Sequence, residues 1–246
     1  MSVLAVIPAR FASTRFPGKP LANDTGKYLI QHVYERVIAA ERIDECVVAT
    51  DDERIVEAVR SFGGNVEMTS ADHPSGTDRI AEVVERRSGA DDDIIVNVQG
   101  DEPELEPTYL DRLVERLANS PCSMATLACP FPQGSDPRDP NCVKVVLNQR
   151  KEALYFSRSL IPYEPDADAG GERWLLHLGV YAYRRAFLME YSQWVQTALE
   201  RVEKLEQLRA LEHGRAIAVE VVERACIGID TPQDYEEFVK RWRGRR

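Results

Sequence analysis

Short apolar stretches alternate with segments of helical periodicity along the first hundred residues of the chain. Strands are expected at residues 3–7, at 46–49, near 66 and at 94–98, since each stretch is short, apolar and bounded by polar or turn-forming residues. Helices are expected at residues 29–40, 55–59 and 80–84, where apolar side chains recur every three or four positions. The continuous β-branched run at 94–98 is typical of a parallel strand that is covered on both faces.

Beyond residue 120 the alternation is less regular. Further strands are predicted at residues 143–147, 153–156, 180–183 and 216–222, with a Pro- and Gly-bearing stretch at 162–171. Leucine and valine side chains at helical spacing predict one amphipathic helix through residues 199–211. A last helix is predicted after Thr231, which has the residue type of an N-cap and is followed by Pro232 and Asp234.

This order of elements predicts an α/β fold with a doubly wound, mostly parallel central sheet, that is, a Rossmann-like fold. Because no linker or internal repeat is visible, we expect a single domain over residues 1–246 with an inserted subregion at approximately 150–195. In such a fold, ligands bind at the carboxyl ends of the strands.

The charge balance limits the classes of partner. The 246 residues carry 31 Lys+Arg against 41 Asp+Glu, a net charge of −10. Nucleic acid and an anionic membrane are therefore not expected as partners, because both are bound by basic surfaces. The first 22 residues, however, contain no acid and include Arg10, Arg15 and Lys19, which predicts a local anion site.

Cysteine usage and the first residues favour a cytoplasmic protein. The five cysteines form no Cys-x-x-Cys pair and fit reduced thiols, so a structural metal site is not expected. The first apolar run is too short for a signal peptide or a membrane span.

The loop after the first predicted strand carries the clearest chemistry. Residues 8–20 combine three cations, hydroxyl groups and Gly18, a set that suits a polyphosphate because arginine donates in a planar fork. The loop is neither a Walker A nor a Gly-x-Gly-x-x-Gly motif. Taken alone, its composition is equally compatible with a solvated basic loop.

Two aspartates stand at predicted strand-to-loop or loop-to-helix junctions. Asp101 follows the strand at 94–98 and could hold Mg²⁺ against phosphates, although Gly, Asp and Pro together also make an ordinary turn. Asp230 precedes the last helix, where an aspartate commonly belongs to the helix start. Only the fold could bring these two side chains together.

Several motifs, in order along the chain, resemble the 3-deoxy-manno-octulosonate cytidylyltransferase (CMP-Kdo synthetase) family. They are Ile-Pro-Ala-Arg at 7–10, Pro-Gly-Lys-Pro-Leu at 17–21, residues 71–79, 96–103 and 153–158, His-Leu-Gly at 177–179, residues 205–209 and Gly-Ile-Asp-Thr-Pro at 228–232. Together they extend from Val3 to about Val239. The resemblance implies transfer of CMP from CTP to the anomeric hydroxyl of Kdo, with release of pyrophosphate, for lipopolysaccharide synthesis.

The resemblance also implies roles for residues on the nucleotide side. Lys19, Asp101 and Asp230 are the implied catalytic residues, with Asp101 and Asp230 holding two Mg²⁺ ions. The implied nucleotide-binding residues are Pro8, Ala9, Arg10, Ser13, Arg15, Lys19, Ser75, Gly76 and Arg79. Metal and cations aimed at the developing charge are what nucleotidyl transfer requires.

On the sugar side, the resemblance implies binding by Gln99, Arg158, His177, Glu206 and Gln207, with Arg158 on the sugar carboxylate. Without the resemblance, His177 would be interpreted as a core or edge histidine, and Glu206 and Gln207 as solvated positions on a charged helix. The inserted subregion is expected to bind sugar and to dimerise, since the family implies a homodimer.

Two departures from the family pattern bear on sugar preference. Ala225-Cys226 stand where Pro-Gly is common, and Ala182 replaces a common glycine. A cytidylyltransferase for 8-amino-Kdo or a sialic acid is therefore an alternative. A catalytically silent nucleotide-sugar-binding protein is another, although the presence of Lys19, Asp101 and Asp230 together argues against it.

Overall fold

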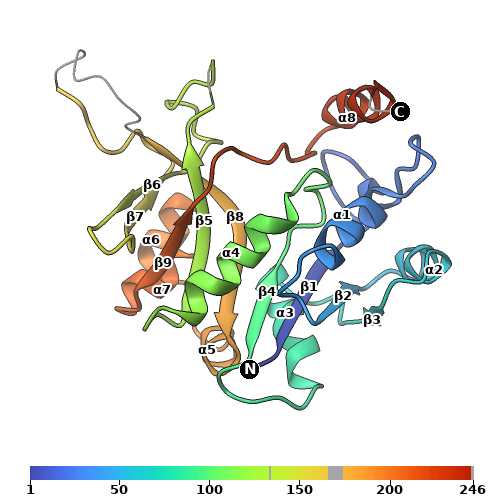
Figure 1. Cartoon of the computed structure of the whole chain (residues 1–246), viewed down its shortest axis with the longest axis horizontal. Helices are drawn as coiled ribbons and strands as arrows, with labels where there is room; N and C mark the ends of the chain where they lie inside the picture. The colour runs from blue at the N-terminus through green and yellow to red at the C-terminus, as the bar shows by residue number, and fades with distance from the viewer. Residues whose placement is uncertain (133, 166–173, 245–246) are drawn as a thin grey trace. The chain divides into compact units, whose positions relative to one another are not determined.

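The computed structural model describes residues 1–132, 134–165 and 174–244 (Figure 1). The chain packs into two compact units: the first comprises Met1–Asp111 with Cys226–Arg246, and the second comprises Arg112–Ala225. The insertion predicted at about 150–195 falls within the second unit, and its residues 166–173 lie outside the described residues. The single-domain reading stays a prediction.

The first unit contains four parallel strands in the order β3-β2-β1-β4. Their bounds are β1 Val3–Ala9, β2 Glu45–Thr50, β3 Val66–Met68 and β4 Ile94–Asn97. All four residues of β4 are buried, as its β-branched run predicts. The strand order reverses between β1 and β4, which is the place where ligands bind in open parallel sheets.

Helices connect these strands and pack on them. They are α1 (Leu29–Ile38), α2 (Glu53–Ser61) and α3 (Gly76–Glu85), preceded by the short 3₁₀ helix η1 (Lys19–Leu21). α1 and α3 contact β1 and β2, whereas α2 contacts β2 and β3. Since crossover connections are right-handed, a chain that runs outward through β2 and β3 and then returns to β4 places α3 on the face opposite α1 and α2. The predicted doubly wound α/β class is confirmed.

The last helix, α8 (Pro232–Gly244), belongs to the first unit and begins as predicted. Thr231 Oγ1 accepts a hydrogen bond from the Asp234 amide (3.2 Å), and Asp234 Oδ2 accepts one from the Thr231 amide (2.8 Å). Ile229, just before the helix, is buried in a core cluster with Leu29, Tyr235, Phe238 and Val239. This packing fixes the segment that carries Asp230.

The second unit is mixed rather than parallel. Its strands are β5 (Met124–Pro130), β6 (Lys144–Leu147), β7 (Ala153–Ser157), β8 (Leu175–Arg184) and β9 (Ile217–Val221). β9 pairs with β5 in parallel, whereas β8 pairs with β5 and β6, and β6 with β7, in antiparallel fashion. Among its described residues, three short helices accompany them: α5 (Arg185–Tyr191), α6 (Ala198–Glu203) and α7 (Leu208–Glu212).

Several elements differ from the sequence expectations. The strand β5, the helix α5 and the helix α4 (Pro107–Ala118), which crosses the boundary between the units, were not predicted. The single helix expected through 199–211 is two helices, because Lys204 adopts a left-handed backbone conformation (φ 55°) that ends α6. Leu199 and Val202 are 40% and 80% exposed, so the regular apolar spacing does not mark one buried face.

Within the described ranges, none of the helices has the length and apolar composition needed to cross a bilayer.

Candidate active site

The loop that follows β1 is shaped by Gly18 and Phe11. Gly18 has a φ of +71°, a left-handed conformation that favours glycine, and a Cβ there would lie 3.1 Å from the Phe11 ring. The Gly18 amide donates to the Phe11 carbonyl (3.0 Å), which closes the loop on itself. The Arg54 guanidinium of α2 lies 3.3 Å from the centroid of the same ring. These contacts hold the basic loop before η1 begins at Lys19.

Lys19 joins the two aspartates that the sequence singles out. Its Nζ lies 2.7 Å from Asp101 Oδ2 and 3.9 Å from Asp230 Oδ1, and it donates to the Ile229 carbonyl (2.8 Å). The Ile229 amide donates to the Asp101 carbonyl (2.9 Å), so the segment before α8 is tied to the segment after β4. Residues that are far apart in sequence thus meet around one ammonium group.

Arg15 adds a second cation to this group. Its guanidinium contacts the Asp230 carboxylate at 3.0 Å and 3.1 Å. Both side chains are more than half exposed, so the pair contributes little to stability and is free to rearrange when an anion binds.

A cavity of about 310 Å³ lies beside these groups. Gly76, at the start of α3, and Gly100 both approach Pro8, and a Cβ at Gly100 would lie 3.1 Å from the Pro8 carbonyl oxygen. Nine of the residues that the resemblance names line this cavity: Pro8, Ala9, Arg10, Ser13, Lys19, Ser75, Gly76, Gln99 and Asp101. Ala12, Pro20, Pro74 and Gly100 complete the lining.

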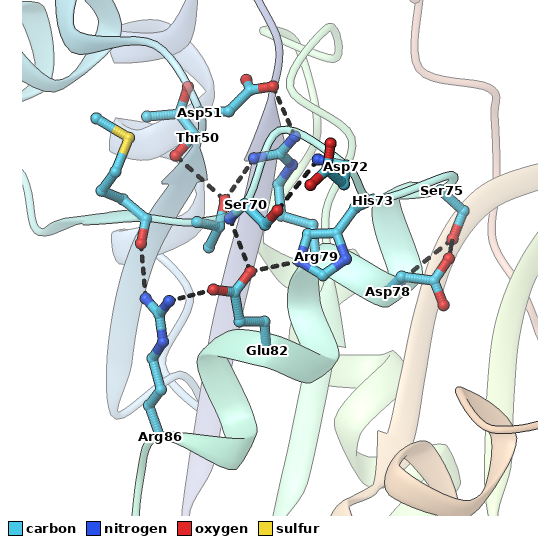
Figure 2. Close-up of polar contacts among 12 residues, drawn as sticks. Thr50, Asp51, Ser70, Asp72, His73, Ser75, Asp78, Arg79, Glu82 and Arg86 are labelled. Carbon is cyan, nitrogen blue, oxygen red and sulfur yellow. Dashed lines mark hydrogen bonds and ion pairs between the residues drawn. The ribbon is translucent and has the colours of Figure 1, made fainter.

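Arg79 does not line this cavity. Its side chain is fully buried, its Nη2 lies 3.1 Å from Asp51 Oδ2, and its Nη1 donates to Thr69 Oγ1 (Figure 2). Thr69 in turn donates to the Thr50 carbonyl (3.1 Å). The guanidinium therefore ties α3 to the ends of β2 and β3, and its implied contact with the nucleotide stays a prediction.

Of the five sugar-side candidates, Gln99 lies in the first unit. The other four lie in the second unit: Arg158, His177, Glu206 and Gln207. Gln207 is 3% exposed, and within the described residues its Nε2 has no hydrogen-bond partner. A buried amide donor without a partner is costly, and a ligand hydroxyl would satisfy it. Glu206, next to it, is held through its carbonyl, which accepts a hydrogen bond from the Tyr191 hydroxyl (2.7 Å). Gln207 is thus buried and Glu206 half-buried, and both lie between α6 and α7 rather than on one charged helix.

Arg158 is engaged by backbone carbonyls. Its Nε donates to the Glu203 carbonyl and its Nη1 to the Pro140 carbonyl, both at 2.8 Å. The Glu203 carboxylate accepts from the Ser157 hydroxyl (2.6 Å) and from the Arg158 amide (3.0 Å). In this arrangement the guanidinium positions the loop after α6, and its implied contact with the sugar carboxylate stays a prediction.

Lys144, which the sequence analysis did not single out, supports the same region. Its side chain is fully buried, and its Nζ donates to the carbonyls of Asp139 (3.1 Å), Cys142 (2.6 Å) and Arg158 (2.5 Å). Burial lowers the pKa of this lysine. The sequence signal is a lysine within an apolar β-branched strand, where a charged side chain is expected only if it is satisfied internally.

His177 on β8 is buried and polar contacts fix its ring. Its Nε2 lies 3.0 Å from Thr126 Oγ1, and its ring packs edge-on against Phe156 with a centroid distance of 4.9 Å. Burial lowers the pKa of His177 to about 3, because the charged imidazolium would lose its hydration. The side chain is therefore neutral at pH 7 and can accept or donate a hydrogen bond to a sugar, but carries no charge to it.

This pKa predicts an acid-sensitive fold. Above pH 6.5, His177 is neutral in both the folded and the unfolded chain and does not lower the free energy of unfolding. As the pH falls from 6.5 towards 3, the unfolded chain binds a proton at this histidine and the folded chain does not, so the free energy of unfolding falls. We expect the free energy of unfolding in urea to fall by about 2 kcal/mol between pH 7 and pH 5 on this account. His177→Gln should remove that part of the slope, whereas His213→Gln, at an exposed histidine, should retain it. An unchanged slope in His177→Gln would contradict the assignment.

Comparisons with known proteins place the chain in a family. The cytidylyltransferase family matches residues 4–217. The 3-deoxy-manno-octulosonate cytidylyltransferase of Geobacter sulfurreducens is 51% identical, over 98% of this chain and 99% of that protein. That of Yersinia pseudotuberculosis is 47% identical, over 96% of each chain.

Solved structures agree with this assignment. A CMP:2-keto-3-deoxy-manno-octonic acid synthetase complexed with CTP superimposes with a TM-score of 0.93, at 43% identity over 100% of both chains. A 4-diphosphocytidyl-2C-methyl-D-erythritol synthase, at 15% identity, 97% coverage of both chains and a TM-score of 0.66, shares the fold alone. The chain therefore belongs to the 3-deoxy-manno-octulosonate cytidylyltransferases, within the cytidylyltransferase family.

Proposed function

We propose that this protein transfers CMP from CTP to the anomeric hydroxyl of Kdo and releases pyrophosphate, which supplies CMP-Kdo for lipopolysaccharide synthesis. The observation that carries the proposal is the meeting of Lys19 with Asp101 and Asp230 beside the cavity that follows β1, in a chain about half identical to named enzymes of this activity. Cations suit the triphosphate, and carboxylates suit a metal bound to it.

The nucleotide fits the first unit. Pro8, Ala9, Ser75 and Gly76 line the cavity and would frame the base and ribose, while Arg10, Ser13, Arg15 and Lys19 would bind the triphosphate. Lys19 has an orienting network already in place, since the Ile229 carbonyl and Asp101 fix its ammonium. A cation held in advance stabilises the negative charge that grows on the departing pyrophosphate without further reorganisation.

Asp101 and Asp230 fit Mg²⁺. Their carboxylate oxygens contact one shared ammonium, so a single small region already attracts cations. Magnesium prefers oxygen ligands and is commonly bound by one or two protein carboxylates together with substrate phosphates. Within the described residues no group of three His, Cys, Asp or Glu side chains could hold a metal, so the remaining ligands would be phosphate oxygens and water. When bound, the two ions that we propose would neutralise the triphosphate and activate the sugar hydroxyl.

The sugar-side candidates suit an acid sugar with many hydroxyl groups. Gln207 offers a buried donor that has no partner in the described residues, and the neutral His177 offers a ring nitrogen. Gln99 and Glu206 would add further hydroxyl contacts, and Arg158 would bind the carboxylate. We propose in addition a homodimer in the cytoplasm, on the strength of the family resemblance and of the need for CTP.

A pyrophosphate-release assay with CTP, Mg²⁺ and a panel of acid sugars tests this proposal. We expect turnover with Kdo that exceeds turnover with 8-amino-Kdo or a sialic acid, because the sugar-side motifs follow the Kdo pattern. Preferred turnover of another acid sugar would reassign the substrate. Binding of CTP without turnover of any sugar would favour a silent nucleotide-binding protein.

A further inference from the structure

One face of α3 holds the segment between β3 and α3. Arg79, Glu82 and Arg86 are three and four residues apart and so lie on the same side of the helix. Arg79 and Glu82 contact that segment, Arg79 at Thr69 and Glu82 at Ser70 and His73, and Arg86 contacts the Met68 carbonyl at the end of β3 (Figure 2). The conformation of residues 68–75 is thus set by side chains of the helix that follows it.

Glu82 is the centre of these contacts. Its carboxylate accepts hydrogen bonds from the Ser70 amide (2.9 Å), from His73 Nε2 and from Arg86. Burial alone would raise the pKa of Glu82, but the hydrogen bonds from His73 and Ser70 and the charge of Arg86 outweigh it and lower the pKa. Glu82 is therefore an ionised acceptor, and hydrogen bonds to an ionised acceptor are the stronger ones.

Residues 73 and 75 of this segment orient the Arg10 side chain through their carbonyl groups. Arg10 Nη2 donates to the carbonyl of His73 (2.5 Å) and to that of Ser75 (3.2 Å). Arg10, Pro74 and Ser75 all line the cavity in which CTP is proposed to bind. A shift of the His73 backbone would therefore reorient a guanidinium that lines this cavity.

We propose that His73 and Glu82 are positioning residues for CTP binding, which act by fixing the two carbonyl groups that orient Arg10. The inference rests on the proposed function, because it takes CTP as the ligand of the cavity. It goes beyond that function by assigning a role to two residues that do not line the cavity. If the effect passes through Arg10, loss of His73 and loss of Arg10 are not additive.

The test is a calorimetric titration with Mg-CTP in the absence of sugar. His73→Ala should weaken CTP binding by about tenfold, because an arginine that loses its orientation loses a charge-assisted contact. His73→Gln should stay within about twofold of the unchanged protein, since the glutamine amide nitrogen can replace the Nε2 donor. The double variant Arg10→Ala/His73→Ala should bind CTP no more weakly than Arg10→Ala alone.

Matched controls separate this role from a general loss of structure. Glu85→Ala removes an exposed carboxylate from the same helix and should leave CTP binding unchanged. Glu82→Gln retains the shape of the side chain and should weaken binding in the same direction as His73→Ala, which keeps the test open if His73→Ala does not fold. Equal CTP affinity in His73→Ala, or a double variant whose loss is the product of the two single losses, would overturn the inference. Absence of CTP binding in the unchanged protein would instead contradict the proposed function.

Discussion

Asp101→Ala is expected to lower kcat by at least about a thousandfold, which corresponds to about 4 kcal/mol of lost transition-state stabilisation. Asp101 supplies a carboxylate beside Lys19 at the cavity, and the other lining residues after β4, Gln99 and Gly100, carry no acid. Asp101 is a proposed metal ligand, and loss of such a ligand would remove the charge neutralisation that lets a hydroxyl attack a triphosphate. Pyrophosphate release measures the effect directly.

The fold should survive this change. The Asp101 side chain is 30% exposed, and the tie to the segment before α8 uses its backbone carbonyl, which alanine retains. Circular dichroism and thermal unfolding should therefore match those of the unchanged protein closely. Asp91→Ala, at an exposed aspartate of the same unit, is the control and should leave kcat unaltered. Turnover of Asp101→Ala close to normal would remove Asp101 from the metal role.

Lys19→Met is expected to have the second largest effect, a loss of about a hundredfold to ten-thousandfold in kcat/KM. The substitution keeps the apolar stem and removes the only charge that bridges Asp101 and Asp230 in the described structure. Both CTP affinity and kcat should fall, because in the proposed role the ammonium would face charge in the bound triphosphate and still more charge in the departing pyrophosphate.

A lysine in the same unit provides the control for this experiment. Lys27 pairs with Glu35 at 2.6 Å, is partly exposed and does not line the cavity. Lys27→Met therefore removes one ion pair and one positive charge at a position outside the cavity. Its kcat/KM should change by less than about twofold, since exposed pairs contribute little. Equal kinetics of Lys19→Met and Lys27→Met would contradict a role for Lys19 in the transfer.

The first unit could be predicted from the sequence because its strands are short, apolar and regularly spaced. β1, β2 and β4 follow from continuous apolar runs, and the start of α8 follows from the capping pair Thr231 and Asp234. The helix α4 carries Leu110, Leu113, Val114 and Leu117 at helical spacing, all buried, so a signal for it was present and was missed.

The second unit was harder to predict because local pattern does not determine strand pairing. β5 is flanked by β8 and β9, which come from much later in the chain, and nothing in its own residues indicates those partners. The helix ends near Lys204 because this residue, although not a glycine, adopts a left-handed backbone conformation. The pattern of hydrophobic positions gives no indication of such a conformation.

For the candidate site, the sequence indicated which residue types to expect but not where each side chain lies in the fold. Residue type singled out Lys19, Asp101 and Asp230 as candidates, the family resemblance implied their roles, and the fold brings them together. Type alone did not show that Arg79 is fully buried against Asp51, nor that Arg158 donates to the carbonyls of Pro140 and Glu203. Hydrogen-bond partners of arginine depend on which loops lie near it, and those loops are distant in sequence.

The most direct test of the central claim follows the phosphorus atoms of CTP by ³¹P NMR in the presence of Mg²⁺ and Kdo. The account predicts that the triphosphate signals are replaced by equal amounts of one phosphodiester, from CMP-Kdo, and pyrophosphate, and that omission of Kdo leaves CTP intact. Cleavage of CTP to CDP and orthophosphate, or release of free CMP without a Kdo phosphodiester, would contradict it.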